Sequence, residues 1–268
     1  MPTTPDYLVI GHVSKDLQPG GAAPRAGGTA TYSALAAQRL GLQAAIVTAL
    51  APEDNYLLDG PRSEGVWLHA IPSLHTTTFH NVYDPQGHRT QTLTAHASDI
   101  AFADIPGEWR NAPIVHLGPV AQELPYSMTA MFSHCLLGVT PQGWMRSWDN
   151  SGHVRQDALP ISPALRDLTP NAVIVLSIED LRFDTAALRE YALLAGIVVV
   201  TQGASDALIF KQGQLIGSVP ALKTTPLDLT GAGDVFATAF LIRYHETSDP
   251  IESAHAAHTA AAHAIAGE

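Results

Sequence analysis

The stretch Asp228-Leu229-Thr230-Gly231-Ala232-Gly233-Asp234-Val235-Phe236-Ala237-Thr238-Ala239-Phe240 lies near the carboxyl end of a chain of 268 residues. After Gly233 the apolar residues recur at the spacing of a helix, so the glycines are predicted to stand where that helix begins. The first N–H groups of a helix have no acceptor within it, and this end carries partial positive charge. The stretch therefore predicts a site for an anion, such as a phosphoryl group in transfer.

Asp234 falls in the first turn of this predicted helix. A carboxylate at a helix start is stabilised as an anion, and in that form it can accept a proton from a hydroxyl group. An ordinary turn in which the Asp only caps the helix is the alternative. The full Thr-Gly-Ala-Gly-Asp run at the start of an amphipathic helix favours the functional interpretation.

Short apolar runs precede this stretch and alternate with helical patterns. The runs are nearly continuous, which is typical of parallel strands covered on both faces. The order predicts an α/β fold with a doubly wound, mostly parallel sheet that binds ligands beyond the carboxyl ends of its strands. The predicted strands are Tyr7–Gly11, Ala44–Thr48, Ile114–Leu117, Leu136–Thr140, Ala172–Ser177 and Ile197–Thr201. The predicted helices are Thr29–Leu40, Asp184–Leu194, Gly233–Tyr244 and Ile251–Ala266.

The composition fits one domain spanning residues 1–268. An apolar content of 46% with only 15% charged residues excludes a disordered chain. The net charge of −11 argues against non-specific binding of nucleic acid, which needs a basic surface. We find no apolar run long enough to span a membrane and no signal-peptide pattern, so we expect a cytoplasmic protein without a membrane partner.

Residues 75–94 break the alternation of strands and helices. A Thr-rich strand, the turn Asp84-Pro85-Gln86-Gly87 and a return strand predict a hairpin that is too polar for the central sheet. Two interpretations stay open at this point, a lid over a cleft or a solvated edge hairpin. If it is a lid, we expect the lid to comprise about residues 12–26 and 74–96.

Thr230-Gly231-Ala232-Gly233-Asp234 resembles the C-terminal signature of the ribokinase/PfkB-type carbohydrate kinases, and the resemblance covers nearly the whole chain. Gly11–Asp16 resembles the family's first strand and turn, and Gly27-Gly28 its double-glycine motif. Thr201-Gln202-Gly203 is similar to its Thr-x-Gly turn. The hairpin falls where the family carries a β-lid, so the resemblance implies a ribokinase-like fold.

The resemblance implies an ATP-dependent kinase that uses Mg²⁺ and phosphorylates a hydroxyl of a small sugar, a polyol such as myo-inositol, or a nucleoside. The backbone of Gly231, Ala232 and Gly233 would form an anion hole, and Asp234 would be the catalytic base. The family's lids often pair between subunits, so a homodimer through the lid is one possible assembly. Asp16, Gly27, Gly28 and Tyr32 would contact the acceptor, and Thr201, Gly203 and Thr230 the nucleotide.

The sequence departs from the family pattern at three places. Tyr32 stands where the family often has Asn, which changes the sugar pocket. The Asn-x-x-Glu motif reads Ser177-Ile178-Glu179-Asp180, which leaves Asp180, with Glu179 beside it, as the candidate metal-organising carboxylate. Asp206 replaces the last Gly of the Thr-x-Gly turn. These departures motivate a second hypothesis, a sugar- or nucleotide-binding protein with little kinase activity.

Gly138–Arg146 follows a predicted strand at its carboxyl end. The segment is similar to the equivalent region of the inositol-kinase-like branch of the family. Gln142 and Arg146 are therefore candidate contacts to substrate or phosphate. The alternative is a surface loop on which Trp144 packs.

Overall fold

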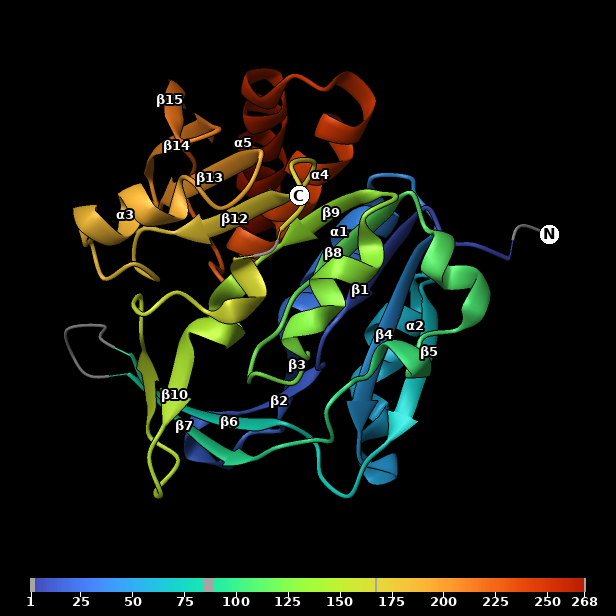
Figure 1. The fold of residues 1–268 in the computed structure, drawn as a ribbon. Coiled ribbons are helices and arrows are strands. Elements are labelled where there is room, and N and C mark those ends of the chain that lie inside the picture. The colour runs from blue at the N-terminus through green and yellow to red at the C-terminus, as the bar shows by residue number, and fades with distance from the viewer. Residues whose placement is uncertain (1–2, 84–88, 167, 268) are drawn as a thin grey trace.

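The centre of the molecule is one large twisted sheet (Figure 1). The computed structural model describes residues 3–83, 89–166 and 168–267. Among these residues the sheet has nine strands in the order β15-β14-β13-β12-β9-β8-β1-β4-β5. From β5 to β13 neighbouring strands pair in parallel, whereas β13, β14 and β15 pair antiparallel. The strands are β1 (Tyr7–Ile10), β4 (Ala44–Leu50), β5 (Trp67–Pro72), β8 (Ile114–Leu117), β9 (Leu136–Val139), β12 (Val173–Ser177), β13 (Ile197–Gln202), β14 (Ser205–Lys211) and β15 (Gln214–Val219).

Each face of the sheet is covered by a different layer. Tyr7 and Val9 of β1 join an apolar cluster with α1 (Thr29–Arg39), α4 (Ala232–Thr247) and α5 (Pro250–Ala266). Leu8 and Ile10 join a second cluster on the other face, where α3 (Thr185–Tyr191) and short 3₁₀ turns pack. A five-residue helix, α2 (Asp59–Ser63), precedes β5. Burial on both faces explains why the strands read as continuous apolar runs.

The predicted α/β fold is confirmed, and each predicted strand and helix is present with its ends shifted by a few residues. The sequence analysis missed β5, β14 and β15. β5 and β15 lie at the sheet edges and keep most side chains partly exposed, and β14 alternates buried with exposed positions. Strands of this kind lack the continuous apolar run on which the prediction depended.

The strand order reverses between β1 and β8. From β1 the chain builds outward through β4 to β5, then returns to the other side of β1 at β8. Gly11 and Gly118 follow these two strands and touch, because a Cβ on Gly11 would lie 2.3 Å from the Gly118 carbonyl oxygen. In open α/β sheets, ligands bind at this kind of switch point.

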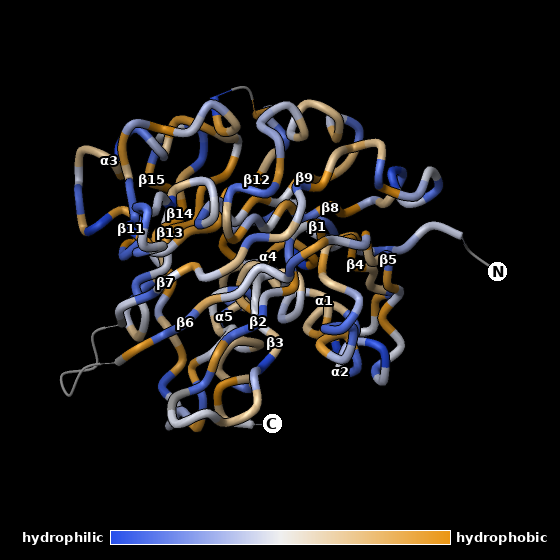
Figure 2. Tube along the Cα trace, turned by 90° about the horizontal axis from the view of Figure 1, so that it is seen from below, coloured by the Kyte–Doolittle hydropathy of each residue, from blue (hydrophilic) through white to orange (hydrophobic). Residues whose placement is uncertain are grey.

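A smaller sheet covers this end of the molecule. Its order is β3 (Arg25–Gly27), β2 (Ser14–Leu17), β6 (Thr78–Tyr83) and β7 (Arg89–Ala95), and Figure 2 views the molecule from its side. The hairpin predicted between residues 75 and 94 is the β6–β7 pair, whereas its predicted turn at 84–87 lies outside the described residues. A second hairpin, β10 (Arg146–Trp148) with β11 (Val154–Gln156), extends the sheet where Leu93 N–H donates to Gly152 O at 2.8 Å.

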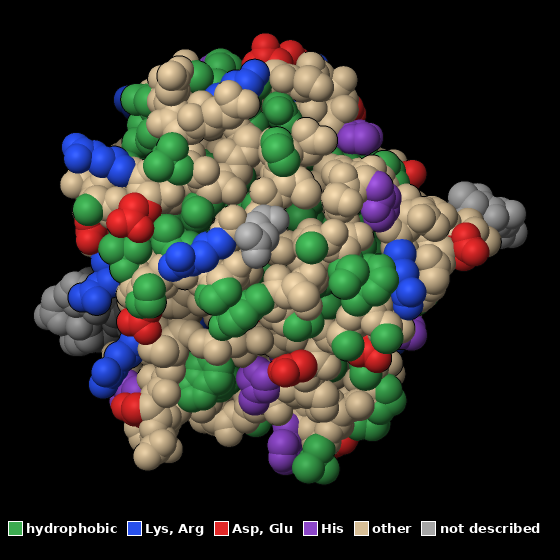
Figure 3. Space-filling model, viewed as in Figure 1, with side chains coloured by type: hydrophobic (Ala, Val, Ile, Leu, Met, Phe, Trp, Pro, Cys, Tyr) green, Lys and Arg blue, Asp and Glu red, His purple; other side chains and the backbone are tan. Residues whose placement is uncertain are grey.

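The surface carries charge of both signs. On the face drawn in Figure 3, Lys and Arg side chains lie apart from one another, with Asp and Glu near several of them. In the part of the chain that the structure describes, no helix combines the length and the apolar character needed to cross a membrane.

We expect Gly138→Ala to destabilise the fold. A Cβ at Gly138 in β9 would lie 2.2 Å from Cδ1 and 2.7 Å from Cδ2 of Leu241, which is fully buried in α4. Overpacking of this kind costs on the order of 1–3 kcal/mol. Urea denaturation should show a lower midpoint than for the wild type. Gly60→Ala is the control, because no atom lies within 4 Å of its added Cβ, and equal midpoints for the two variants would contradict the packing described.

Candidate active site

A cavity of about 260 Å³ lies at the carboxyl ends of the parallel strands. It is bounded by the segments that follow β9 and β12, by the end of β13, and by the first turn of α4. The residues lining it are Thr29, Thr140, Pro141, Gln142, Val175, Leu176, Ser177, Asp180, Thr201, Leu229, Gly231, Ala232, Gly233 and Asp234. The predicted glycine-rich turn and the predicted base thus lie in one cavity.

The chain enters α4 through a left-handed residue. Gly231 has φ 77°, and its carbonyl accepts the N–H of Val235 at 2.9 Å. A Cβ at Gly231 would lie 2.5 Å from the ring of Tyr32, so the ring closes against the turn and only glycine fits. The Ala232 N–H donates to the Leu229 carbonyl at 3.2 Å, just before the helix. Gly233 and Asp234 follow in the first turn and line the cavity, and their N–H groups have no acceptor within the helix, as an anion hole requires.

Asp234 is a half-buried carboxylate in this first turn. Burial raises its pKa to about 6, although a hydrogen bond with Thr29 and the charge of Arg146 lower it; the charge of Asp180 raises it further. The sequence predicted a carboxylate that its position stabilises as an anion. This part of the prediction is wrong, because burial disfavours the anion and raises the pKa. A carboxyl group with a pKa near 6 is ionised at neutral pH and is a better proton acceptor than an ordinary Asp.

Gln142 and Arg146 belong to one buried polar network beside the cavity. The Arg146 guanidinium donates to Gln142 Oε1 at 2.7 Å and to the Val120 carbonyl at 2.8 Å, and lies 5.4 Å from the centre of the Phe79 ring. Gln142 Nε2 donates to Asp180 Oδ1 at 3.1 Å. Trp144 is buried as well, so the surface-loop alternative for this segment is wrong.

Asp180 lines the cavity but already accepts several hydrogen bonds. Its donors are the amides of Gln142 and Gln156 and the N–H of Ser177. Glu179 is exposed and does not line the cavity. Across the described ranges, no group of three His, Cys, Asp or Glu side chains is placed to hold a metal ion. Of the two predicted metal-organising carboxylates, Asp180 is the one that lines the cavity, where it would be available to a magnesium ion held mainly by phosphate oxygens and water.

The predicted acceptor contacts form a second group under the small sheet. The Asp16 carboxylate lies on Gly27, where a Cβ would approach Asp16 Oδ2 to 2.4 Å, and it accepts the Ser14 hydroxyl at 2.9 Å. Gly28 has φ 86° and no space for a side chain, because a Cβ would meet the His12 carbonyl at 2.4 Å. These residues lie next to Thr29 and so connect the small sheet to the cavity.

Tyr32 lies between the two groups. Its pKa is raised to about 12 by burial and by the charges of Asp16 and Asp234, so both carboxylates are near its ring. Its hydroxyl donates to the Ala26 carbonyl at 3.3 Å. Tyr32 therefore touches the glycine-rich turn with its ring and β3 of the small sheet with its hydroxyl.

The predicted nucleotide contacts are more dispersed. Thr201 lies in β13 and lines the cavity, whereas Gly203 is in the turn to β14 and does not line it. Thr230 precedes the glycines, and its N–H and hydroxyl both donate to Asp228 Oδ1. Asp206 accepts the Ser218 hydroxyl of β15 at 2.6 Å, so its carboxylate is directed toward that strand.

Three residues of the site were missed by the sequence analysis. Thr29 follows the double glycine and Thr140 follows β9, so their position at element ends was a usable signal. Glu123 gave no signal. It is fully buried and accepts the N–H groups of His12, Val120 and Ala121, which ties the loops after β1 and β8 together. Burial would raise its pKa, but His12 and the backbone donors hold that pKa below the ordinary value.

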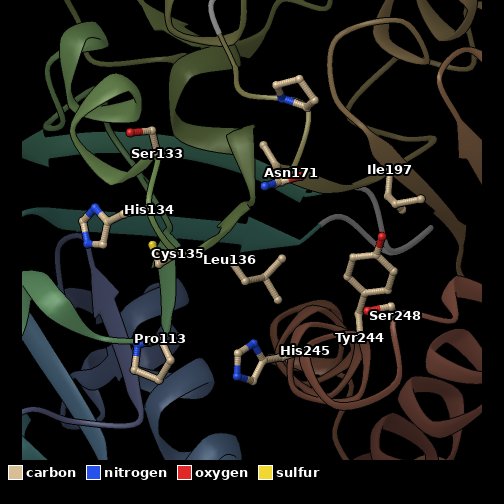
Figure 4. A pocket seen from close by; sticks show the side chains of 12 residues that line it. Pro113, Ser133, His134, Cys135, Leu136, Asn171, Ile197, Tyr244, His245 and Ser248 are labelled. Carbon is tan, nitrogen blue, oxygen red and sulfur yellow. The ribbon is translucent and has the colours of Figure 1, made fainter.

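A larger cavity of about 400 Å³ lies at the opposite ends of the strands, their amino ends (Figure 4). It is formed at the amino ends of β8, β9, β12 and β13 and at the end of α4. Its described lining contains no carboxylate, and burial raises the pKa of its Cys135 thiol to about 11. In its described lining this cavity therefore offers neither a carboxylate nor an anionic nucleophile, and its basic groups are the imidazoles of His134 and His245.

Comparisons with known proteins assign the chain to a family. The family profile described as "pfkB family carbohydrate kinase" matches residues 12–267. The chain belongs to the pfkB carbohydrate kinase family. It is therefore a carbohydrate kinase, and the resemblance inferred from its sequence is confirmed. A comparison with curated protein sequences finds no significant match.

Solved structures share the ribokinase-like fold over almost the whole chain. A pyrophosphate-dependent kinase of the ribokinase family, in a sulfate complex, is 22% identical with a TM-score of 0.80 and covers 97% of this chain and 95% of its own. Ribokinase from Arabidopsis thaliana, complexed with ribose and ATP, is 18% identical with a TM-score of 0.72, covering 98% and 93%. A nucleoside kinase from Methanocaldococcus jannaschii is 15% identical with a TM-score of 0.70, covering 97% and 91%.

The raised pKa of Asp234 predicts that its ionisation costs stability in this pfkB kinase. The folded protein binds this proton more tightly than the unfolded chain, so stability falls as pH rises between about 4 and 6. Asp234→Asn should therefore be more stable than the wild type at pH 8, by on the order of 1–3 kcal/mol, and not at pH 4.

Urea denaturation at the two pH values measures this difference. Glu179→Gln, the neighbouring exposed acid, is the control and should match the wild type at both. A stability of Asp234→Asn below that of the wild type at pH 8 would show that the carboxylate is net stabilising.

Proposed function

We propose that this carbohydrate kinase transfers the terminal phosphoryl group of Mg-ATP to a hydroxyl of a small sugar, a polyol such as myo-inositol, or a nucleoside. The observation that carries the proposal is Asp234, a carboxylate with a pKa near 6 in the same helical turn as the glycine-rich anion hole. An acceptor hydroxyl and the phosphoryl group it attacks must lie side by side, and this turn offers one contact to each.

The reaction follows from these two contacts. Asp234 accepts the proton of the acceptor hydroxyl as its oxygen forms a bond to phosphorus, and the bond from phosphorus to the leaving ADP oxygen breaks. The N–H groups at the start of α4 stabilise the charge on the phosphoryl oxygens in flight. Magnesium neutralises the phosphates of the donor when bound, and Asp180 and its amide partners orient that side of the cavity.

The acceptor is proposed to bind between the small sheet and α1. Asp16 is the charged side chain there, and Gly27 and Gly28 bring backbone close to the ligand. The small sheet acts as a lid that excludes water during transfer. We also predict a homodimer formed through this sheet, which light scattering tests. The proposed use of ATP fits a cytoplasmic enzyme.

ATP is the proposed donor because apolar side chains stand exposed beside the cavity. Leu229 lines it, is 65% exposed, and could cover a purine ring. Leu227, 79% exposed, lies next to it on the same loop. Pyrophosphate is the second candidate donor, favoured by the similarity to the pyrophosphate-dependent kinase, and it would make no use of these leucines.

We expect wild-type protein to phosphorylate at least one member of a panel of sugars, polyols and nucleosides, and Asp234→Asn to lower that turnover by roughly 10²–10⁴-fold, since it removes the general base. Phosphorylated product is measured with ATP and with pyrophosphate as donors. Calorimetry with each panel member tests the binding-protein hypothesis. Tight binding without turnover would support that hypothesis and contradict the proposed kinase.

Leu229→Ser separates the two donors. Loss of apolar contact with a purine should raise the KM for ATP by roughly 5- to 10-fold and leave the KM for pyrophosphate within about twofold. Leu215→Ser, at an exposed leucine of β15 outside the cavity lining, is the matched control. Faster turnover with pyrophosphate than with ATP in the wild type would overturn ATP as the donor.

A further inference from the structure

A chain of hydrogen bonds runs through the buried sheet and ends at the cavity. The Tyr7 hydroxyl of β1 lies 2.7 Å from His116 Nδ1 of β8, and His116 Nε2 lies 3.0 Å from the Thr140 hydroxyl. The Tyr7 hydroxyl also donates to Thr238 of α4 at 3.2 Å. Thr140 lines the cavity beside Asp234.

These hydrogen-bonded side chains lie in an unusual place, inside the buried layer between the sheet and its helices. Tyr7, His116 and Thr238 are fully buried, with Ser33 of α1 beside Tyr7, in a sheet and helix layer whose other members are mainly apolar. Burial lowers the pKa of His116 to about 3, so the imidazole is neutral at physiological pH. A neutral imidazole has one N–H and one lone pair, which makes each of its two hydrogen bonds directional.

The number of protons on these groups fixes which group donates in each hydrogen bond of the series. Because Tyr7 gives its one proton to Thr238, its oxygen accepts from Nδ1–H of His116. His116 Nε2 then has only a lone pair, so the Thr140 hydroxyl donates to it. The Thr140 oxygen is left with its lone pairs available to the cavity and no hydrogen to offer there.

Resting on the proposed function, we propose that Thr140 binds the acceptor by accepting a hydrogen bond from one of its hydroxyl groups, and that His116 and Tyr7 are positioning residues that hold Thr140 in this orientation.

The charge pattern of the cavity supports this assignment. Phosphate oxygens accept hydrogen bonds and do not donate them, so the Thr140 oxygen has nothing to offer a donor phosphate. The first turn of α4 presents N–H groups instead. A sugar or polyol hydroxyl can donate to Thr140 and still present its oxygen elsewhere. The two sides of the cavity thus discriminate between acceptor and phosphoryl donor by hydrogen-bond polarity.

Thr140→Val tests the contact, because it removes the hydroxyl at nearly constant shape. With the best acceptor from the panel, we expect the KM for that acceptor to rise roughly 5- to 10-fold, as for loss of one neutral hydrogen bond. The KM for the phosphoryl donor should stay within about twofold. Thr140→Ser should restore the acceptor KM. Thr129→Val, at a buried threonine in a 3₁₀ turn away from the cavity, is the matched control.

Substrate analogues identify the hydroxyl concerned. Monodeoxy and monodeoxyfluoro versions of the acceptor are titrated into the wild type and Thr140→Val by calorimetry. At one position both analogues should bind the wild type more weakly, since neither can donate a hydrogen bond, and Thr140→Val should bind them as it binds the parent acceptor.

Tyr7→Phe tests the positioning role. It leaves His116 Nδ1 without its partner, which permits the other tautomer, with Nε2–H donating to Thr140. The KM for the acceptor should then rise. Thermal denaturation should show that the variant is still folded at the assay temperature. An unchanged KM in Tyr7→Phe would overturn the role of Tyr7 and His116. An unchanged acceptor KM in Thr140→Val would overturn the contact itself. Absence of wild-type turnover on every panel member would instead contradict the proposed function.

Discussion

Backbone packing between Gly11 and Gly118 sets the geometry of the whole site. With no side chain between them, the loops after β1 and β8 meet at the point where the strand order reverses. Glu123 secures the contact by accepting N–H groups from both loops. The loop after β1 leads into β2 and Asp16, and β8 lies beside β9 and Thr140. The approach of two glycines therefore brings the small sheet over the cavity.

The electrostatics of the site reconcile an acidic protein with an anionic ligand. Asp180 and Asp234 line the cavity, and Asp16 lies under the small sheet. Asp180 is covered by amide and N–H donors, and the buried Arg146 offsets part of the negative charge near Asp234. The N–H groups at the start of α4 add partial positive charge that belongs to the backbone itself. A chain with a net charge of −11 thus needs only local compensation to accept phosphate.

Features encoded locally were predictable from the sequence, and features created by packing were not. The start of α4 follows from Gly231, Gly233 and the helical pattern after them, and the inner parallel strands follow from their apolar runs. The edge strands β5 and β15 gave too little apolar signal. The raised pKa of Asp234 and the role of Glu123 depend on burial by distant segments, which no local pattern records.

The contact between Tyr32 and Gly231 links two elements that are far apart in the sequence. Because the ring fills the space where a side chain at 231 would begin, α1 and the start of α4 fit together as complementary surfaces. Replacement of the tyrosine by a smaller residue would open a void directly against the turn that we propose binds phosphate. If position 32 contacts the acceptor as the family resemblance implies, substitutions there are constrained by the packing that Gly231 needs, and we expect the two positions to change together across relatives.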